Sequence, residues 1–119
     1  MKISYAITVC NELNEITHLL NLLIMKKRKQ DEIVVLFDKK NGTPEVWDRI
    51  TELKDDGCCS YHAKTFKHHF DDWKNQLTKL CSGDYIFQID ADEYPHDSLI
   101  SQLPVILEAN PENEVYLIP

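Results

Sequence analysis

Apolar runs of strand length alternate with segments of helical period along the whole chain, and this alternation constrains the fold more than any other feature of the sequence. The predicted strands are residues 3–10, 33–37, 58–62, 85–89 and 115–118. Each of the first four is followed by residues whose apolar positions recur at helical spacing. This order predicts an α/β fold, with a mainly parallel sheet and helices on both of its faces.

Individual residues mark the limits of the predicted helices. Pro44 suits the first turn of the second helix, because its missing N–H would have no partner there in any case. The third helix is predicted to bury Trp73 and Leu77, and Gly83 is predicted to follow its last turn as the C′ residue. No low-complexity linker and no internal repeat divides residues 1–119, so we expect a single domain.

Composition and charge exclude several classes of function. The 13 Lys and Arg and the 20 Asp and Glu give a net charge of −7, which disfavours binding to nucleic acid. No apolar stretch approaches the roughly 20 residues of a transmembrane helix, and no secretory signal is recognisable. The four cysteines include an adjacent pair and no C-x-x-C spacing, which favours reduced thiols. The expected location is the cytoplasm.

Glycine is scarce in this chain, which limits how it could bind a phosphate group. The three glycines are Gly42, Gly57 and Gly83. Neither G-x-G-x-x-G nor G-x-x-x-x-G-K-[ST] can be written with them. A bound phosphate would therefore have to be held by something other than a glycine-rich loop.

Polar side chains follow three of the predicted strands. They are Asn11 and Glu12 after the first strand, Asp38 after the second, and Asp90, Asp92 and Glu93 after the fourth. Ligands of open parallel sheets bind beyond the carboxyl ends of the strands, at the point where the strand order reverses. We therefore expect these side chains to lie along one edge of the sheet.

Several carboxylates at one edge repel one another unless solvent, a proton or a cation offsets their charge. Asp90 and Asp92 are predicted to alternate along an extended backbone, so that both point to one side and Ala91 points away. Their oxygens suit Mn²⁺ or Mg²⁺, and such an ion keeps open positions for phosphate oxygens. From the residues alone, the alternative is that the two aspartates end a strand and cap a turn.

The segment 75–93 resembles the stretch around the D-x-D motif of the family 2 glycosyltransferases, which have the GT-A fold. The resemblance lies in Gly-Asp-Tyr at 83–85 and Asp-Ala-Asp-Glu at 90–93. Residues 3–15 and 32–38 are similar to the first two strands of that family. The resemblance implies a Rossmann-like nucleotide-binding half. It also implies an enzyme that binds a nucleotide-diphosphate sugar and transfers the sugar to an acceptor hydroxyl with inversion.

The same resemblance implies roles for individual residues. The implied nucleotide-binding residues are Asn11, Glu12, Asp38, Asn75 and Asp90, and the implied metal ligands are Asp90 and Asp92. Asp92 matches the residue that holds the metal on the diphosphate. Asp38 matches the acid that contacts the base, but Lys39 and Lys40 follow it where the family often has two acids or Asp-Gly-Ser. This departure makes the predicted base contact less secure.

The family's domain continues beyond the metal motif into an acceptor-binding half, which normally supplies the catalytic base. This sequence ends at Pro119, so we expect it to be the nucleotide-binding half, with the base and the acceptor unidentified. A truncated module that binds nucleotide without catalysis is the main alternative. The predicted last strand also leaves open a homo-oligomer formed by pairing at the sheet edge.

Other functions fit the sequence less well. A haloacid-dehalogenase-type phosphatase also has a D-x-D motif after a strand, but it expects Gly-Thr or Gly-Val where Glu93-Tyr94 stand. A receiver domain needs an acidic pair after the first strand, and none is present there. The cysteines and histidines have no usual zinc spacing. His68, His69 and His96 are most simply exposed loop residues.

Overall fold

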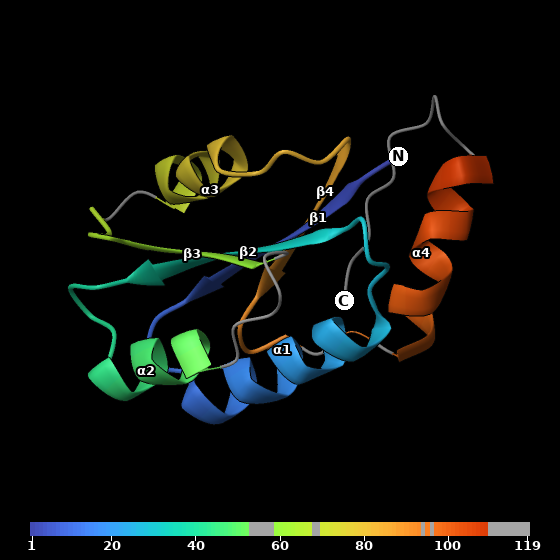
Figure 1. Cartoon of the computed structure of the whole chain (residues 1–119). Coiled ribbons are helices and arrows are strands. Elements are labelled where there is room, and N and C mark those ends of the chain that lie inside the picture. Colours follow the sequence, from blue (N-terminus) through green and yellow to red (C-terminus); the bar gives the residue numbers. More distant parts are fainter. Residues whose placement is uncertain (53–58, 68–69, 94, 96, 110–119) are drawn as a thin grey trace.

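The computed structural model describes residues 1–52, 59–67, 70–93, 95 and 97–109. In this part of the chain strands and helices alternate (Figure 1). The elements are β1 (Ile3–Val9), α1 (Leu13–Lys26), β2 (Glu32–Asp38), α2 (Pro44–Glu52), β3 (Cys59–Lys64), α3 (Phe70–Lys79), β4 (Tyr85–Asp90) and α4 (Asp97–Ala109). The predicted α/β order is confirmed, and Pro44 is the first residue of α2 as predicted. The predicted last strand, 115–118, lies outside the described residues.

The strands form one parallel sheet in the order β3-β2-β1-β4. The chain builds outward from β1 to β2 and β3, and then returns to place β4 on the other side of β1. The strand order therefore reverses beside β1, and the carboxyl ends of β1 and β4 flank the point of reversal. The register aligns Thr8 with Asp90 and Val9 with Phe37, so the ends of three strands lie level.

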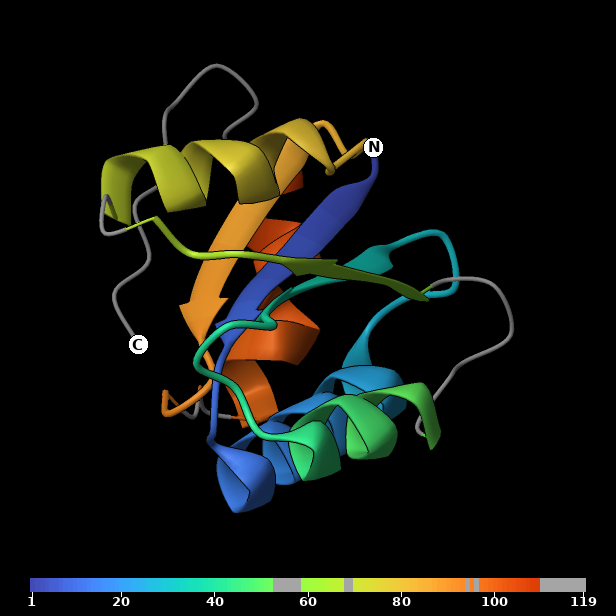
Figure 2. The ribbon, with the colours of Figure 1, turned by 90° about the vertical axis from the view of Figure 1, so that its left-hand side faces the viewer.

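Helices cover both faces of the sheet, as predicted. Helices α1, α2 and α4 lie on one face and α3 lies on the other (Figures 1 and 2). The central strand β1 is buried on both faces, which is typical of parallel sheets. The smaller core, between the sheet and α3, consists of Ala6, Val34, Leu36, Trp73 and Leu77. None of the helices in the described residues is long and apolar enough to cross a membrane.

The prediction that Gly83 is the C′ residue of α3 is wrong, because α3 already ends at Lys79. Gly83 instead lies against the beginning of β1. A Cβ atom at this position would lie 2.6 Å from Ser4 Oγ and 2.8 Å from Ser4 N. The backbone N–H of Gly83 also donates a hydrogen bond to Ser4 Oγ at 2.8 Å. Glycine is therefore required by close approach to the sheet.

We expect the Gly83→Ala variant to be less stable than the wild type by about 1–3 kcal/mol, which is the usual cost of forcing an extra carbon into a packed site. The clash involves backbone as well as a side chain, so the loop has to move away from β1. Urea unfolding measures the loss. Ser101→Ala, at an exposed position of α4, is the control and should change stability by less than about 0.5 kcal/mol. Equal stability of the two variants would contradict this prediction.

Candidate functional site

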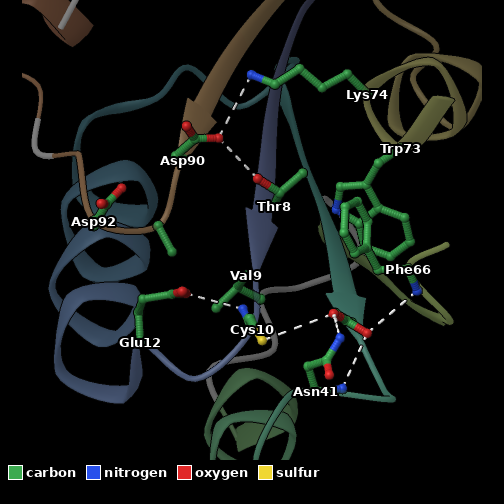
Figure 3. Close-up of a pocket in the computed structure, with 12 residues that line it drawn as sticks. Thr8, Val9, Cys10, Glu12, Asn41, Phe66, Trp73, Lys74, Asp90 and Asp92 are labelled. Atoms are coloured by element: carbon green, nitrogen blue, oxygen red, sulfur yellow. Dashed lines mark hydrogen bonds and ion pairs between the residues drawn. The ribbon is translucent and has the colours of Figure 1, made fainter. Parts of the chain in front are cut away.

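A pocket of about 400 Å³ lies at the carboxyl ends of β2, β1 and β4 (Figure 3). Its lining residues are Thr8, Val9, Cys10, Glu12, Asp38, Asn41, Phe66, Trp73, Lys74, Asp90, Ala91 and Asp92. The pocket spans the point where the strand order reverses, which is where parallel sheets bind ligands. The structure thus brings together four of the residues singled out in the sequence: Glu12, Asp38, Asp90 and Asp92.

Two of the predicted nucleotide-binding residues do not line this pocket. Asn11 is exposed in the turn between β1 and α1, and Asn75 is exposed on α3. Their nucleotide-binding roles remain predictions from the family resemblance. His68, His69 and His96 lie outside the described residues.

The D-x-D segment has a different backbone from the one predicted. Strand β4 ends at Asp90, and the next two residues form a turn in which Glu93 N donates to Asp90 O at 2.9 Å. Ala91 N donates to Thr8 O at 3.1 Å, and the pairing with β1 ends there. The predicted extended alternation is therefore wrong, because no neighbouring backbone continues the ladder. Ala91 is buried and lines the pocket itself, whereas Asp92 is exposed.

Asp90 uses one of its two carboxylate oxygens within the protein. Thr8 Oγ1 donates a hydrogen bond to Asp90 Oδ1 at 3.0 Å, and Lys74 Nζ lies 3.8 Å from the same atom (Figure 3). The side chain of Glu93 accepts a hydrogen bond from Asp90 N at 2.8 Å, which stabilises the turn. Asp90 Oδ2 has no partner among the described residues, so it can accept a ligand.

The donor atoms at the end of β4 fit a hard divalent cation. Asp90 Oδ2 and both carboxylate oxygens of Asp92 make no hydrogen bond or ion pair with the described residues, and carboxylate oxygens are the ligands that Mn²⁺ and Mg²⁺ prefer. Within the described part of the chain, no three His, Cys, Asp or Glu side chains are grouped to hold a metal ion. A cation held at Asp90 and Asp92 would therefore keep positions for ligands from outside the protein.

Asp38 is buried at the end of β2 with 6% of its surface exposed. Asn41 Nδ2 donates to Asp38 Oδ2 at 2.9 Å, while Lys40 N and Phe66 N donate to Oδ1 at 3.0 and 3.4 Å. Burial is the largest single effect and raises the pKa of Asp38, but the hydrogen bonds from Asn41, Lys40 and Phe66 outweigh it, so the pKa is lowered overall. Asp38 is therefore ionised, and both of its oxygens already accept hydrogen bonds.

Cys10 and Glu12 form the floor of the pocket after β1. Cys10 N donates a hydrogen bond to Glu12 Oε2 at 3.0 Å, and the Cys10 thiol lies 4.0 Å from Asp38 Oδ2. Burial raises the pKa of the Cys10 thiol, and the charges of Asp38 and Glu12 raise it further. Because the thiolate is the reactive form of cysteine, this shift makes Cys10 a poorer nucleophile.

Two aromatic rings form the wall of the pocket opposite Asp92. Phe66 follows β3 and Trp73 lies on α3, and their ring centroids are 5.6 Å apart in an edge-to-face arrangement with an interplanar angle of 80°. Figure 3 shows the rings on the far side of the pocket from Asp92 and Glu12. The acidic groups after β4 and the aromatic wall therefore face the same space from opposite sides.

Sequence reasoning missed several of these pocket residues. They are Thr8, Asn41, Phe66, Trp73 and Lys74. The sequence predicted that Trp73 is buried by the third helix, and the structure confirms this, but its place at the edge of the pocket was not predicted. No local signal identifies Phe66, since its place depends on how the segment between β3 and α3 packs.

A parallel α/β sheet with an acid-lined pocket at its point of strand reversal has the arrangement in which open parallel sheets bind their ligands. The sequence model of the family described as Glycosyl transferase family 2 matches residues 4–117, and the chain belongs to this family. The family predicted from the D-x-D region is thereby confirmed. The phosphatase and receiver alternatives belong to other families and are not supported. No curated protein gives a significant sequence match.

Solved structures show the same fold. The structure of TarS residues 1–349 from S. aureus has a TM-score of 0.80 with this chain at 19% sequence identity. The match covers 93% of this chain and 33% of that chain, so this chain spans about one third of the TarS fragment. The same TarS fragment in complex with UDP matches equally well. The likeness confirms the predicted Rossmann-like fold of the GT-A type.

Proposed function

We propose that the chain is the nucleotide-sugar-binding half of a glycosyltransferase. In this proposal the pocket binds a nucleotide-diphosphate sugar with the help of Mn²⁺ or Mg²⁺, and the sugar passes to an acceptor hydroxyl with inversion. The observation that carries the proposal is the pocket itself, which brings the acidic turn after β4 to the ends of β1 and β2. Family membership and the UDP complex of TarS support uridine diphosphate as the first ligand to test.

The residues after β4 would act on the diphosphate. A divalent cation bound by Asp90 and Asp92 would offset the negative charge that develops on the departing diphosphate. Thr8 holds Asp90 Oδ1 in place, and Oδ2 has no partner among the described residues, so it would be available to a cation. Lys74 carries a positive charge 3.8 Å from Asp90 and lines the same pocket, so it adds attraction for phosphate oxygens.

A second candidate function is a module that binds the nucleotide without transferring the sugar. Among the described residues the pocket gathers the groups proposed to hold the nucleotide, and no base for an acceptor hydroxyl is identified among them. The two candidates share the nucleotide site and differ in the reaction. Release of UDP from a UDP-sugar in the presence of acceptor distinguishes them, because only a transferase would show acceptor-dependent release.

We expect UDP to bind the wild-type chain in the presence of Mn²⁺ and to bind at least about tenfold more weakly when the metal is removed with EDTA. The physical reason is that the pocket gathers three carboxylates near the ends of β1 and β4, which repel a diphosphate unless a cation intervenes. Calorimetric titration measures both affinities. Binding of equal strength with and without metal would contradict the proposed metal site, and the absence of any UDP binding would contradict the proposed function.

A further inference from the structure

The three acidic residues of the segment 90–93 are placed differently with respect to the pocket. Asp90 and Asp92 line the pocket, whereas Glu93 is half-buried and does not line it. The Glu93 side chain instead turns back toward the end of β4, where its Oε1 accepts a hydrogen bond from Asp90 N at 2.8 Å. Only two of the three carboxylates are therefore presented to a ligand in the pocket.

Glu93 closes the turn that carries Asp92. Its backbone N–H donates to Asp90 O at 2.9 Å, and its carboxylate accepts from Asp90 N, so the two residues are joined by a reciprocal pair of hydrogen bonds. A hydrogen bond to an ionised acceptor is roughly twice as strong as one between neutral groups. Because Asp92 lies between the two joined residues, this pair restricts the backbone on which its carboxylate is mounted.

Thr8 restrains the other carboxylate from the neighbouring strand. Thr8 and Asp90 are directly opposite each other in the pairing of β1 with β4. The Thr8 hydroxyl donates to Asp90 Oδ1 at 3.0 Å, and Thr8 O accepts from Ala91 N at 3.1 Å (Figure 3). One residue of β1 thus fixes both the side chain of Asp90 and the start of the turn after it.

We propose that Glu93 and Thr8 are positioning residues for the cation, Glu93 through the backbone of the turn and Thr8 through the carboxylate of Asp90, and that Glu93 is not itself a ligand. This inference rests on the proposed function, and the family resemblance assigns no role to either residue. Ligands that are held before the ion arrives lose little freedom when it binds. The partners that hold metal ligands typically change metal affinity by about 10–100-fold when they are removed.

The orientation of Glu93 also suits a diphosphate. Two protein carboxylates leave most positions of a hexacoordinate cation for phosphate oxygens and water. A third carboxylate in the pocket would take one of these positions and would add a negative charge that repels the diphosphate. Turning Glu93 toward the backbone uses its charge to hold the turn while keeping it out of the ligand space.

The variants Glu93→Ala and Glu93→Gln separate positioning from ligation. Titration with Mn²⁺ alone, followed by the electron paramagnetic resonance signal of the free ion, measures metal affinity without nucleotide or activity. Glu93→Ala should bind Mn²⁺ about tenfold more weakly than the wild type. Glu93→Gln should stay within about twofold of the wild type, because its amide oxygen can still accept from Asp90 N. Were Glu93 a ligand, Glu93→Gln would bind as weakly as Glu93→Ala, since a neutral oxygen is a much poorer ligand for a hard cation.

Glu45→Ala is the matched control, because Glu45 is an exposed glutamate in the first turn of α2 and lies outside the pocket. It removes the same charge from the protein and should leave the affinity for Mn²⁺ unaltered. Urea unfolding of all the variants reports whether each one is folded under the conditions of the titration. If Glu93→Ala does not fold, Glu93→Gln and the Thr8 variants decide the inference.

Thr8→Val keeps the shape of the side chain and removes its hydroxyl, whereas Thr8→Ser keeps the hydroxyl. We expect Thr8→Val to bind Mn²⁺ about threefold to tenfold more weakly and Thr8→Ser to bind it within about twofold of the wild type. For UDP, both Thr8→Val and Glu93→Ala should lose affinity in Mn²⁺ and keep the wild-type affinity in EDTA. A loss of equal size in both conditions would mean that the substitution disturbs the pocket as a whole, which would overturn the positioning role.

The outcomes distinguish this inference from the proposed function. If the wild type binds UDP in a metal-dependent way while Glu93→Ala and Thr8→Val keep its full affinity for Mn²⁺, the inference is wrong and the proposed function survives. A Glu93→Gln protein as weak as Glu93→Ala would make Glu93 a ligand and would also overturn the inference. If the wild type binds no UDP in the presence of Mn²⁺, the proposed function itself fails.

Discussion

The Asp92→Asn variant is expected to bind UDP about a hundredfold more weakly than the wild type in the presence of Mn²⁺. Asp92 has no hydrogen-bond or ion-pair partner among the described residues, so its carboxylate is available for a cation. Asparagine keeps the shape of the side chain but offers a neutral oxygen, which is a much poorer ligand for a hard cation. The effect should disappear in EDTA, because the metal-free protein does not use this carboxylate to hold the nucleotide.

The stability of Asp92→Asn should stay within about 0.5 kcal/mol of the wild type, since the residue is exposed and has no hydrogen-bond or ion-pair partner among the described residues. Asp48→Asn is the matched control, because Asp48 is an exposed aspartate on α2, away from the pocket. Calorimetric titration and urea unfolding of the three proteins separate binding from folding. An Asp92→Asn protein with wild-type affinity in Mn²⁺ would remove this residue from the proposed metal site.

The order of the elements could be predicted because the strongest signals are local. Residues 33–37 form a continuous apolar run that is buried on both sides, and such a run is characteristic of an inner parallel strand. Pro44 likewise marks a helix start by its own covalent structure. Gly83 was misassigned because its role depends on Ser4, a residue 79 positions away in the sequence. Contacts of this range are not encoded in a local pattern.

The candidate site was predicted in position but not in geometry. The rule that ligands bind at the carboxyl ends of parallel strands led to Glu12, Asp38 and the D-x-D segment, and the structure places these residues around one pocket. The backbone of the D-x-D segment depends on where β1 stops pairing, which the alternation of residues does not reveal. The hydrogen-bond donors to Asp38 come partly from the segment after β3. The sequence therefore could not show that both oxygens of this carboxylate accept hydrogen bonds.

We expect the Asp38→Ala variant to lose about 3–5 kcal/mol of stability, because it leaves backbone N–H groups without the ionised acceptor that they share. Those N–H groups belong to Lys40, Asn41 and Phe66, so the turn after β2 and the segment after β3 should loosen together. Asp38→Asn is the matched variant and should lose only about 1 kcal/mol. It keeps an oxygen for the backbone donors, and the Asn41 amide can turn over to present its own oxygen to the new amide group.

The pH dependence of stability gives a sharper test of the same contacts. The folded-state pKa of Asp38 lies below its ordinary value of 3.8, so its contribution to stability is complete above about pH 4 and is lost as the pH falls through the folded pKa. The difference in unfolding free energy between wild type and Asp38→Asn should therefore shrink as the pH falls below about 4. The pKa of Glu32 is also lowered, because hydrogen bonds from Ser4 and Ser82 outweigh the effect of its burial, but Glu32 is present in both proteins and cancels. Urea unfolding between pH 7 and pH 2.5 measures the difference. A difference that stays constant over this range would mean that the charge of Asp38 does not stabilise the fold, and the aromatic wall would then have to be held by packing alone.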